Sequence, residues 1–192
     1  MMSDRRMYLI ALAVVAALFF GTCCYGYVSS ISEPDAADDI VGTFQSSTTE
    51  LDTEAPALLS WQIFFNNVKV CLILFIGGVT FGAVTLFVLV SNGYVIGNIS
   101  GVMLRGYDLS VFAATIVPHG IFEIAAMLMA SALGLQMGRS LYLDAQGRDN
   151  AGTTCLWYGT RFLLVVLPLL VVAALVETFA TPVISGMVLD WL

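Results

Sequence analysis

The stretch VCLILFIGGVTFGAVTLFVLV, from Val70 to Val90, contains no charged side chain and decides the fold class of the chain. About 20 consecutive apolar residues form a helix long enough to cross the hydrocarbon core of a bilayer. The stretch therefore predicts a membrane-spanning helix, which we expect to run from about Val68 to Val90. Within it, Gly78 and Gly82 are four residues apart, a spacing that lets two helix backbones approach closely.

The composition of the whole chain also indicates a membrane protein. Of its 192 residues, 59% are hydrophobic and 11% are charged, whereas soluble domains carry roughly 25% charged residues. A water-soluble domain of this length could not bury so much apolar surface. The predicted fold class is all-α, a polytopic transmembrane helix bundle.

Three further apolar runs are long enough to cross a bilayer. They are Tyr8 to Val28, about Leu109 to Leu135, and about Leu156 to Thr181. The segment from Ser91 to Asp108 is too polar to cross alone, yet it carries a ladder of small residues on one helical face: Gly93, Gly97 and Gly101. We expect about four spanning helices plus this short glycine-rich helix, either re-entrant or packed inside the protein.

The sequence divides into three regions. Arg5 and Arg6 precede the first apolar run like the charged start of a signal peptide, but no small-x-small cleavage site follows, which predicts an uncleaved signal anchor over residues 1–28. Residues 29–60 are acidic and lack hydrophobic periodicity, so we expect a loosely ordered extracytoplasmic loop. Residues 61–192 form the predicted membrane domain, beginning with aromatic side chains that suit a membrane interface.

The arginines give conflicting evidence about orientation. Arg5 and Arg6 favour a cytoplasmic N-terminus in a multi-pass protein of the cell membrane. With four crossings, however, Arg139, Arg148 and Arg161 would lie outside, against the positive-inside rule. A fifth crossing by the glycine-rich segment would place them in the cytoplasm.

Several function classes find no support in the sequence. The net charge is −7, and the acidic loop would repel nucleic acid and anionic lipid headgroups. No Gly-x-Ser-x-Gly motif is present, and the GGVTFG run lacks the Lys-Ser/Thr ending of a phosphate loop. We therefore expect no enzyme activity and no cofactor; the expected partners are the lipid bilayer, other membrane proteins and a second copy of the chain.

The stretch IVPHGIFEIAA, from Ile116 to Ala126, places costly polar groups inside the third apolar run. His119 and Glu123 are four residues apart and project from one helix face, where they can hydrogen-bond to each other. Pro118 removes a backbone hydrogen bond and Gly120 adds flexibility, so the helix should kink or break there. A single histidine with one or two carboxylates does not suggest a metal site.

Other polar residues of the apolar runs are candidates for the same network. They are Glu177, Asn66, Asn67 and Asn92. Two interpretations stay open: a proton relay, ion site or substrate site, or a buried hydrogen-bonded cluster that fixes the register of the helices.

Several of these motifs together resemble the stage II sporulation protein M family of multi-span membrane proteins. The matching residues are FFNN (Phe64 to Asn67), Gly77, Gly78 and Gly82, SNGYVIG (Ser91 to Gly97), PHGIFEIAA (Pro118 to Ala126), and Gly134 and Gly138. The resemblance covers roughly Trp61 to the C-terminus.

The resemblance implies a scaffold. The family's namesake in spore-forming bacteria is similar to a membrane anchor that gathers peptidoglycan-degrading partners during engulfment, although relatives also occur in organisms that form no spores. We therefore expect a multi-span scaffold that assembles other membrane or envelope proteins. The alternative is a transporter or channel that uses an intramembrane His/Glu site.

Overall fold

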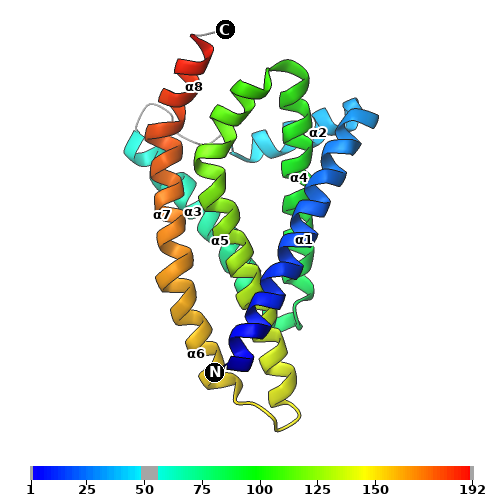
Figure 1. The fold of residues 1–192 in the computed structure, drawn as a ribbon, viewed down its shortest axis with the longest axis vertical. Helices are drawn as coiled ribbons and strands as arrows, with labels where there is room; N and C mark the ends of the chain where they lie inside the picture. The colour runs from blue at the N-terminus through cyan, green and yellow to red at the C-terminus, as the bar shows by residue number, and fades with distance from the viewer. Residues whose placement is uncertain (1, 49–55, 191–192) are drawn as a thin grey trace.

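A computed structural model describes residues 2–48 and 56–190, and every regular element in these ranges is helical (Figure 1). The all-α prediction is therefore confirmed. The elements in chain order are α1 (Met2–Ser32), α2 (Pro34–Thr48), α3 (Pro56–Ile76), η1 (Gly77–Thr80), α4 (Ala83–Gly106), α5 (Leu109–Asp144), α6 (Ala151–Arg161), η2 (Phe162–Val166), α7 (Leu167–Leu175), η3 (Val176–Ala180) and α8 (Thr181–Leu189).

Within the described ranges, five helices rather than four are long and apolar enough to span a membrane: α1, α3 with η1, α4, α5, and the continuous rod from α6 to α8. The expected single helix from Val68 to Val90 is wrong, because the chain reverses inside it. Phe81 and Gly82 both adopt left-handed backbone conformations, with φ of 54° and 88°. Glycine tolerates this conformation because it lacks a Cβ atom. The glycine-rich segment is thus the second half of α4, and not a short or re-entrant helix.

Hydrogen bonds from two threonines hold the turn between α3 and α4. The Thr80 hydroxyl donates to the Gly77 carbonyl at 2.6 Å and accepts the Val84 N–H at 3.0 Å. The Thr85 hydroxyl donates to the Leu74 carbonyl at 2.8 Å. The threonine hydroxyls therefore bond to backbone groups at the end of α3 and the start of α4 that have no partner within the helices.

The same turn packs directly against the backbone of α5. A Cβ atom on Gly138 of α5 would lie 2.8 Å from the Gly78 carbonyl oxygen and 3.0 Å from the Phe81 carbonyl carbon. A Cβ atom on Gly78 would collide with the backbone of Gly134. Glycine at these positions is what allows the turn to touch α5.

The glycine ladder of α4 lies against α1. A Cβ atom on Gly97 would lie 2.9 Å from the Tyr27 nitrogen, and one on Gly93 would lie 2.8 Å from the Phe19 carbonyl oxygen. A Cβ atom on Gly101 would collide with the side chain of Ser30. The C-terminal half of α1 therefore lies in close contact with the second half of α4.

The acidic segment is more ordered than its composition predicts. Helix α1 continues to Ser32, and α2 occupies Pro34–Thr48 at the upper end of the molecule in Figure 1. Ala37 and Val41 are buried, Asp35 lies in the first turn where the helix dipole favours an acid, and Asp38 forms an ion pair with Arg105 of α4. These contacts, which cannot be read from the sequence, pack α2 against the rest of the protein. Residues 49–55 of the expected loop lie outside the described ranges.

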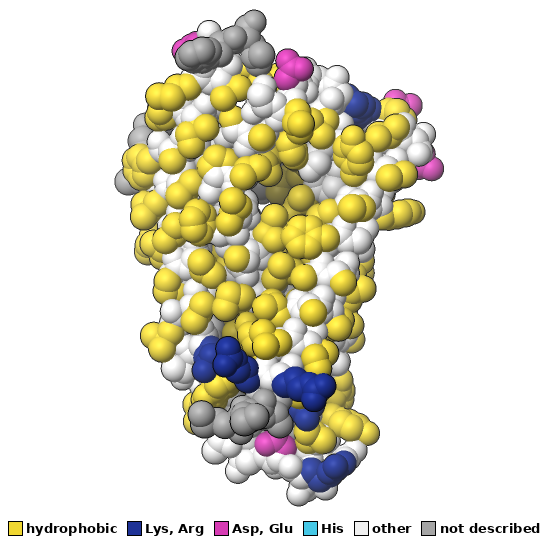
Figure 2. Space-filling model, in the orientation of Figure 1, with side chains coloured by type: hydrophobic (Ala, Val, Ile, Leu, Met, Phe, Trp, Pro, Cys, Tyr) yellow, Lys and Arg dark blue, Asp and Glu magenta, His cyan; other side chains and the backbone are white. Residues whose placement is uncertain are grey.

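The two ends of the molecule differ in charge, and hydrophobic side chains cover the surface between them (Figure 2). With five crossings, the connection between α5 and α6 lies at the same end as the N-terminus (Figure 1). This lower end carries five of the seven Lys and Arg residues of the chain: Arg5, Arg6, Arg139, Arg148 and Arg161. The upper end is mainly acidic, with Glu33, Asp35, Asp38, Asp39, Asp108 and Asp190.

Candidate functional site

The predicted polar site is built on the first half of α5, which continues through Pro118. Figure 1 shows that α5 changes direction in its first third. Proline removes one backbone donor and pushes against the preceding turn, which accounts for a bend without an interruption. Gly120 is buried, and a Cβ atom there would meet only Ile116 of the same helix.

Glu123 is bound by a side chain from another helix. The Asn67 amide of α3 donates a hydrogen bond to Glu123 Oε1. An amide donor can serve a carboxyl group whether or not that group carries a proton. The bond links α3 to α5 and gives the Glu123 carboxyl a partner inside the apolar part of the bundle.

His119 forms its hydrogen bond with a different helix, α8, and not with α3. Its Nδ1 lies 3.4 Å from Thr181 Oγ1, and the Thr181 hydroxyl donates to the Val176 carbonyl at 3.2 Å. Because the threonine proton is used on Val176, the bond requires His119 Nδ1 to be the donor. Thr181 is buried, so this weak bond lies in the packed interface between α5 and α8.

The expected hydrogen bond between His119 and Glu123 does not form among the described residues. Both side chains leave the same face of α5, but α3 and α8 each bring a polar group closer to one of them. Spacing along one helix predicts which residues share a face, but it does not predict which neighbouring helix arrives there.

Glu177 lies in the π-helical turn η3, near enough to Glu123 for the two carboxyl groups to repel each other if both ionise.

Each π-helical turn of the last rod is followed within two residues by a proline, Pro168 after η2 and Pro182 after η3. The missing proline N–H shifts the backbone bonding to the wider i+5 pattern, as in the bond from the Thr181 N–H to the Val176 carbonyl.

The other predicted amides lie outside this cluster. Asn66 is exposed, and Asn92 donates to the Val88 carbonyl of its own helix at 2.8 Å. Three polar atoms of the described residues are buried without a partner: Thr178 Oγ1 beside the cluster, Asn98 Oδ1 in α4, and Gln136 Oε1 at the other end of α5. Thr181 was not predicted from the sequence, because a threonine at the end of an apolar run gives no distinctive signal.

The cluster, consisting of Asn67, Glu123, His119, Thr181 and Glu177, connects α3, α5 and the last rod. Within residues 2–48 and 56–190, no three His, Cys, Asp or Glu side chains lie close enough to bind one metal ion. The arrangement can hold three helices in register, and its carboxyl groups can also exchange a proton.

Comparison with known proteins places the chain in a family. Residues 11–182 match the model of stage II sporulation protein M. The match begins well before Trp61 and so also includes most of α1 and the whole of α2. The chain is 33% identical over 127 residues to an uncharacterized protein of Methanocaldococcus jannaschii, which covers 65% of this chain and 71% of that protein. No solved structure matches the chain. The chain belongs to the stage II sporulation protein M family.

Proposed function

We propose that this protein is a multi-pass membrane scaffold that assembles other membrane or envelope proteins. The observation that carries the proposal is the outer face of α1, the least buried of the five crossing helices. Ala13, Ala17 and Gly21 follow one another at four-residue intervals, all three are exposed, and a Cβ atom on Gly21 would have no atom within 4 Å. Small residues at this spacing let a second helix reach backbone contact.

The opposite face of α1 supports this interpretation. There the helix already packs against a partner with the same spacing, the glycine ladder of α4. Helix α1 thus carries one small-residue face that is occupied within the protein and a second that is open to another membrane helix.

The polar cluster also fits a scaffold. Asn67 and Thr181 bind Glu123 and His119 from two different helices, so the polar groups join helices to one another. A scaffold needs such fixed register, because its partners must meet surfaces of constant shape. On this proposal, His119→Ala and Glu123→Leu each lower the stability of the bundle.

The charge distribution favours a cytoplasmic N-terminus in the cell membrane. Arg139, Arg148 and Arg161 lie at the same end as Arg5 and Arg6, in agreement with the positive-inside rule. The acidic end with α2 then faces outward, where it can meet envelope proteins.

Crosslinking in intact cells tests the scaffold. A photo-reactive amino acid is placed at Ala17, and as a matched control at Leu164, a lipid-facing residue of the last rod that is 71% exposed. We expect a discrete protein adduct from Ala17 that disappears when Gly21→Leu is added, and none from Leu164. If Ala17 yields no protein adduct, or only one with a second copy of this chain, α1 does not recruit other proteins.

Transport is the second candidate, favoured by the nearby carboxyl groups of Glu123 and Glu177 and the unpartnered Thr178 hydroxyl. Purified protein in liposomes is assayed for proton flux against Glu123→Gln. Flux in the wild type that vanishes in a folded Glu123→Gln variant would support transport and contradict the scaffold interpretation.

A further inference from the structure

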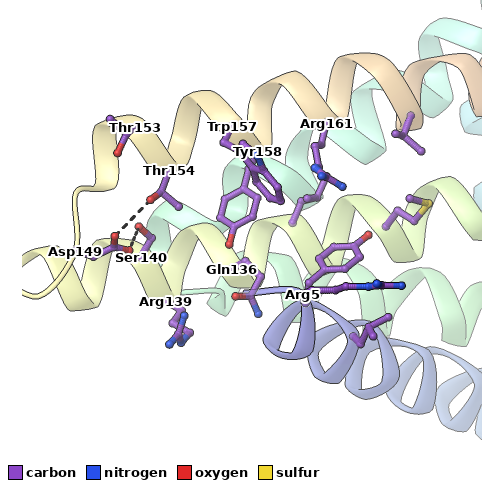
Figure 3. A pocket seen from close by; sticks show the side chains of 15 residues that line it. Arg5, Gln136, Arg139, Ser140, Asp149, Thr153, Thr154, Trp157, Tyr158 and Arg161 are labelled. Carbon is purple, nitrogen blue, oxygen red and sulfur yellow. Dashed lines mark hydrogen bonds between the residues drawn. The ribbon is translucent and has the colours of Figure 1, made fainter. Parts of the chain in front are cut away.

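A second polar site lies at the arginine-rich end, away from the cluster on α5. A cavity of about 700 Å³ lies there between α1, α5 and the start of the last rod (Figure 3). One part of its wall is apolar and includes Leu9, Leu133 and Val165. The other part is polar and includes arginines from three different helices: Arg5, Arg139 and Arg161.

The polar wall carries an excess of positive charge. Its carboxylate is Asp149, whose pKa is lowered by hydrogen bonds from the Ser140 hydroxyl at 2.6 Å and the Asn150 N–H at 2.8 Å, so it is ionised at neutral pH. The ion pair found among the described residues joins Arg105 and Asp38 at the far end of the molecule. The three lining guanidinium groups thus lack a described carboxylate within ion-pair distance.

Two side chains of the polar wall, Arg161 and Gln136, are held in defined positions by other groups of the protein. The Arg161 guanidinium lies over the Trp157 ring, 4.0 Å from its centroid, which restrains it against the cavity wall. Gln136 is 4% exposed; its amide nitrogen donates to the Met7 carbonyl at 3.0 Å, while its oxygen is buried without a partner. A buried acceptor of this kind is costly unless a donor reaches it.

The position of the cavity limits the source of its ligand. Helix α5 has 36 residues and is about 54 Å long, whereas the hydrocarbon core is about 30 Å thick. Arg139 lies in the last two turns of α5, and Arg161 lies in the first third of the last rod, whose 39 residues are also longer than the hydrocarbon core is thick. Both charged groups therefore lie toward the lower end of helices that extend beyond the core. The apolar wall begins one helical turn further into the bundle, with Leu9 four residues after Arg5 and Val165 four residues after Arg161.

We propose that this cavity binds the phosphate group of an anionic phospholipid from the leaflet at the arginine-rich end. Guanidinium groups bind phosphate oxygens in a fork geometry, and basic pockets between membrane helices suit anionic headgroups. The acyl chains lie along Leu9 and Val165, and a headgroup hydroxyl can donate to the unpartnered Gln136 oxygen. The acidic residues that would repel such a lipid lie at the opposite end.

Binding is measured on the purified full-length protein in phosphatidylcholine nanodiscs, by quenching of tryptophan fluorescence as bromine-labelled phosphatidylglycerol is increased. Trp157 lines the cavity and is 47% exposed, so it reports occupancy when Trp61 and Trp191 are replaced by phenylalanine in every protein compared. Arg161→Gln and Arg139→Gln should each weaken binding roughly tenfold or more, the loss expected for a charge-assisted hydrogen bond. Circular dichroism confirms that each variant is folded.

The matched control is Arg148→Gln, which removes the same charge from the same end. Arg148 does not line the cavity, and its side chain contacts Gln146 in the connection between α5 and α6. This control should change binding by less than about twofold, because exposed charges are screened by salt. An equal loss in all three variants would mean a general charge effect and would overturn the proposal.

Two further arms separate a lipid from a soluble ligand. Brominated phosphatidylcholine should quench only weakly and without dependence on Arg161. Inorganic phosphate and glycerol 3-phosphate should fail to displace phosphatidylglycerol at millimolar concentration. Displacement by either would identify a soluble phosphate site, and equal binding of both lipids would show that charge is not recognised; either result refutes the lipid assignment.

Discussion

The backbone contact between α1 and α4 predicts that Gly97→Ala destabilises the protein. A Cβ atom at residue 97 would lie 2.9 Å from the Tyr27 nitrogen and still closer to the Cys23 carbonyl oxygen, whereas ordinary contact begins at 3.4 Å. The helices must therefore separate by at least about 0.5 Å, and backbone atoms cannot rotate out of the way as a side chain would.

The size of the effect follows from two opposing contributions. Overpacking a tight interface costs up to about 3 kcal/mol, and alanine gains up to about 1 kcal/mol over glycine in helix propensity. The net loss should be about 2 kcal/mol. For a chain of this length that corresponds to a Tm lower by about 4–8 °C.

The assay is thermal unfolding in detergent, followed by circular dichroism. The matched control is Gly186→Ala in α8, where a Cβ atom would have no atom within 4 Å. This control should be neutral or slightly stabilising, because only the propensity contribution remains. If Gly97→Ala melts at or above the temperature of Gly186→Ala, then α1 and α4 do not make the backbone contact described above.

Three further predictions test the turn, the cluster and the lower loop by the same unfolding assay. Gly82→Ala forces a side chain into a left-handed conformation at φ 88° and should lower the free energy of unfolding by about 1–2 kcal/mol. An unchanged Tm would mean that residue 82 does not adopt this conformation. Asn67→Leu leaves Glu123 without its donor and should cost about 1–3 kcal/mol, whereas the exposed Asn66→Leu should be nearly neutral; equal effects would mean that the hydrogen bond does not matter. The pKa of Asp149 is lowered in the folded state, so its stabilising effect is present at neutral pH and is lost as the pH falls from about 4 through the folded-state pKa. Asp149→Asn should flatten this part of the Tm–pH curve, and an unchanged curve would show that another group causes the acid loss.

The fold class could be predicted from the sequence, but the number of crossings could not. A hydropathy window averages over about 20 residues, and the turn at Phe81 and Gly82 is apolar on both sides. The sequence shows the polar side chains of segment 91–108 but not the groups that they bond to, so the segment is too polar to predict as a crossing helix. In the structure Asn92 and Ser100 donate to carbonyls four residues earlier in α4, at 2.8 and 2.7 Å, so these groups need no water.

Four of the five members of the polar cluster could be predicted from the sequence, but their hydrogen-bond partners could not. Spacing placed His119 and Glu123 on one face, and the cost of polar groups in a membrane identified Asn67 and Glu177 as candidates. Their actual partners depend on how α3 and the last rod pack around α5. The arginine cavity could not be predicted for the same reason, because its residues come from helices that are distant in sequence.

The turn at Gly82 also determines what the arginines can do together. If Val68 to Val90 formed one crossing, the connection after α5 would lie at the opposite membrane face from the N-terminus, and Arg139 and Arg161 could not share a cavity with Arg5. The reversal adds one crossing and brings all three to the same end. A local backbone conformation, possible because residue 82 lacks a side chain, is therefore the physical origin of the charge asymmetry and of the proposed lipid site.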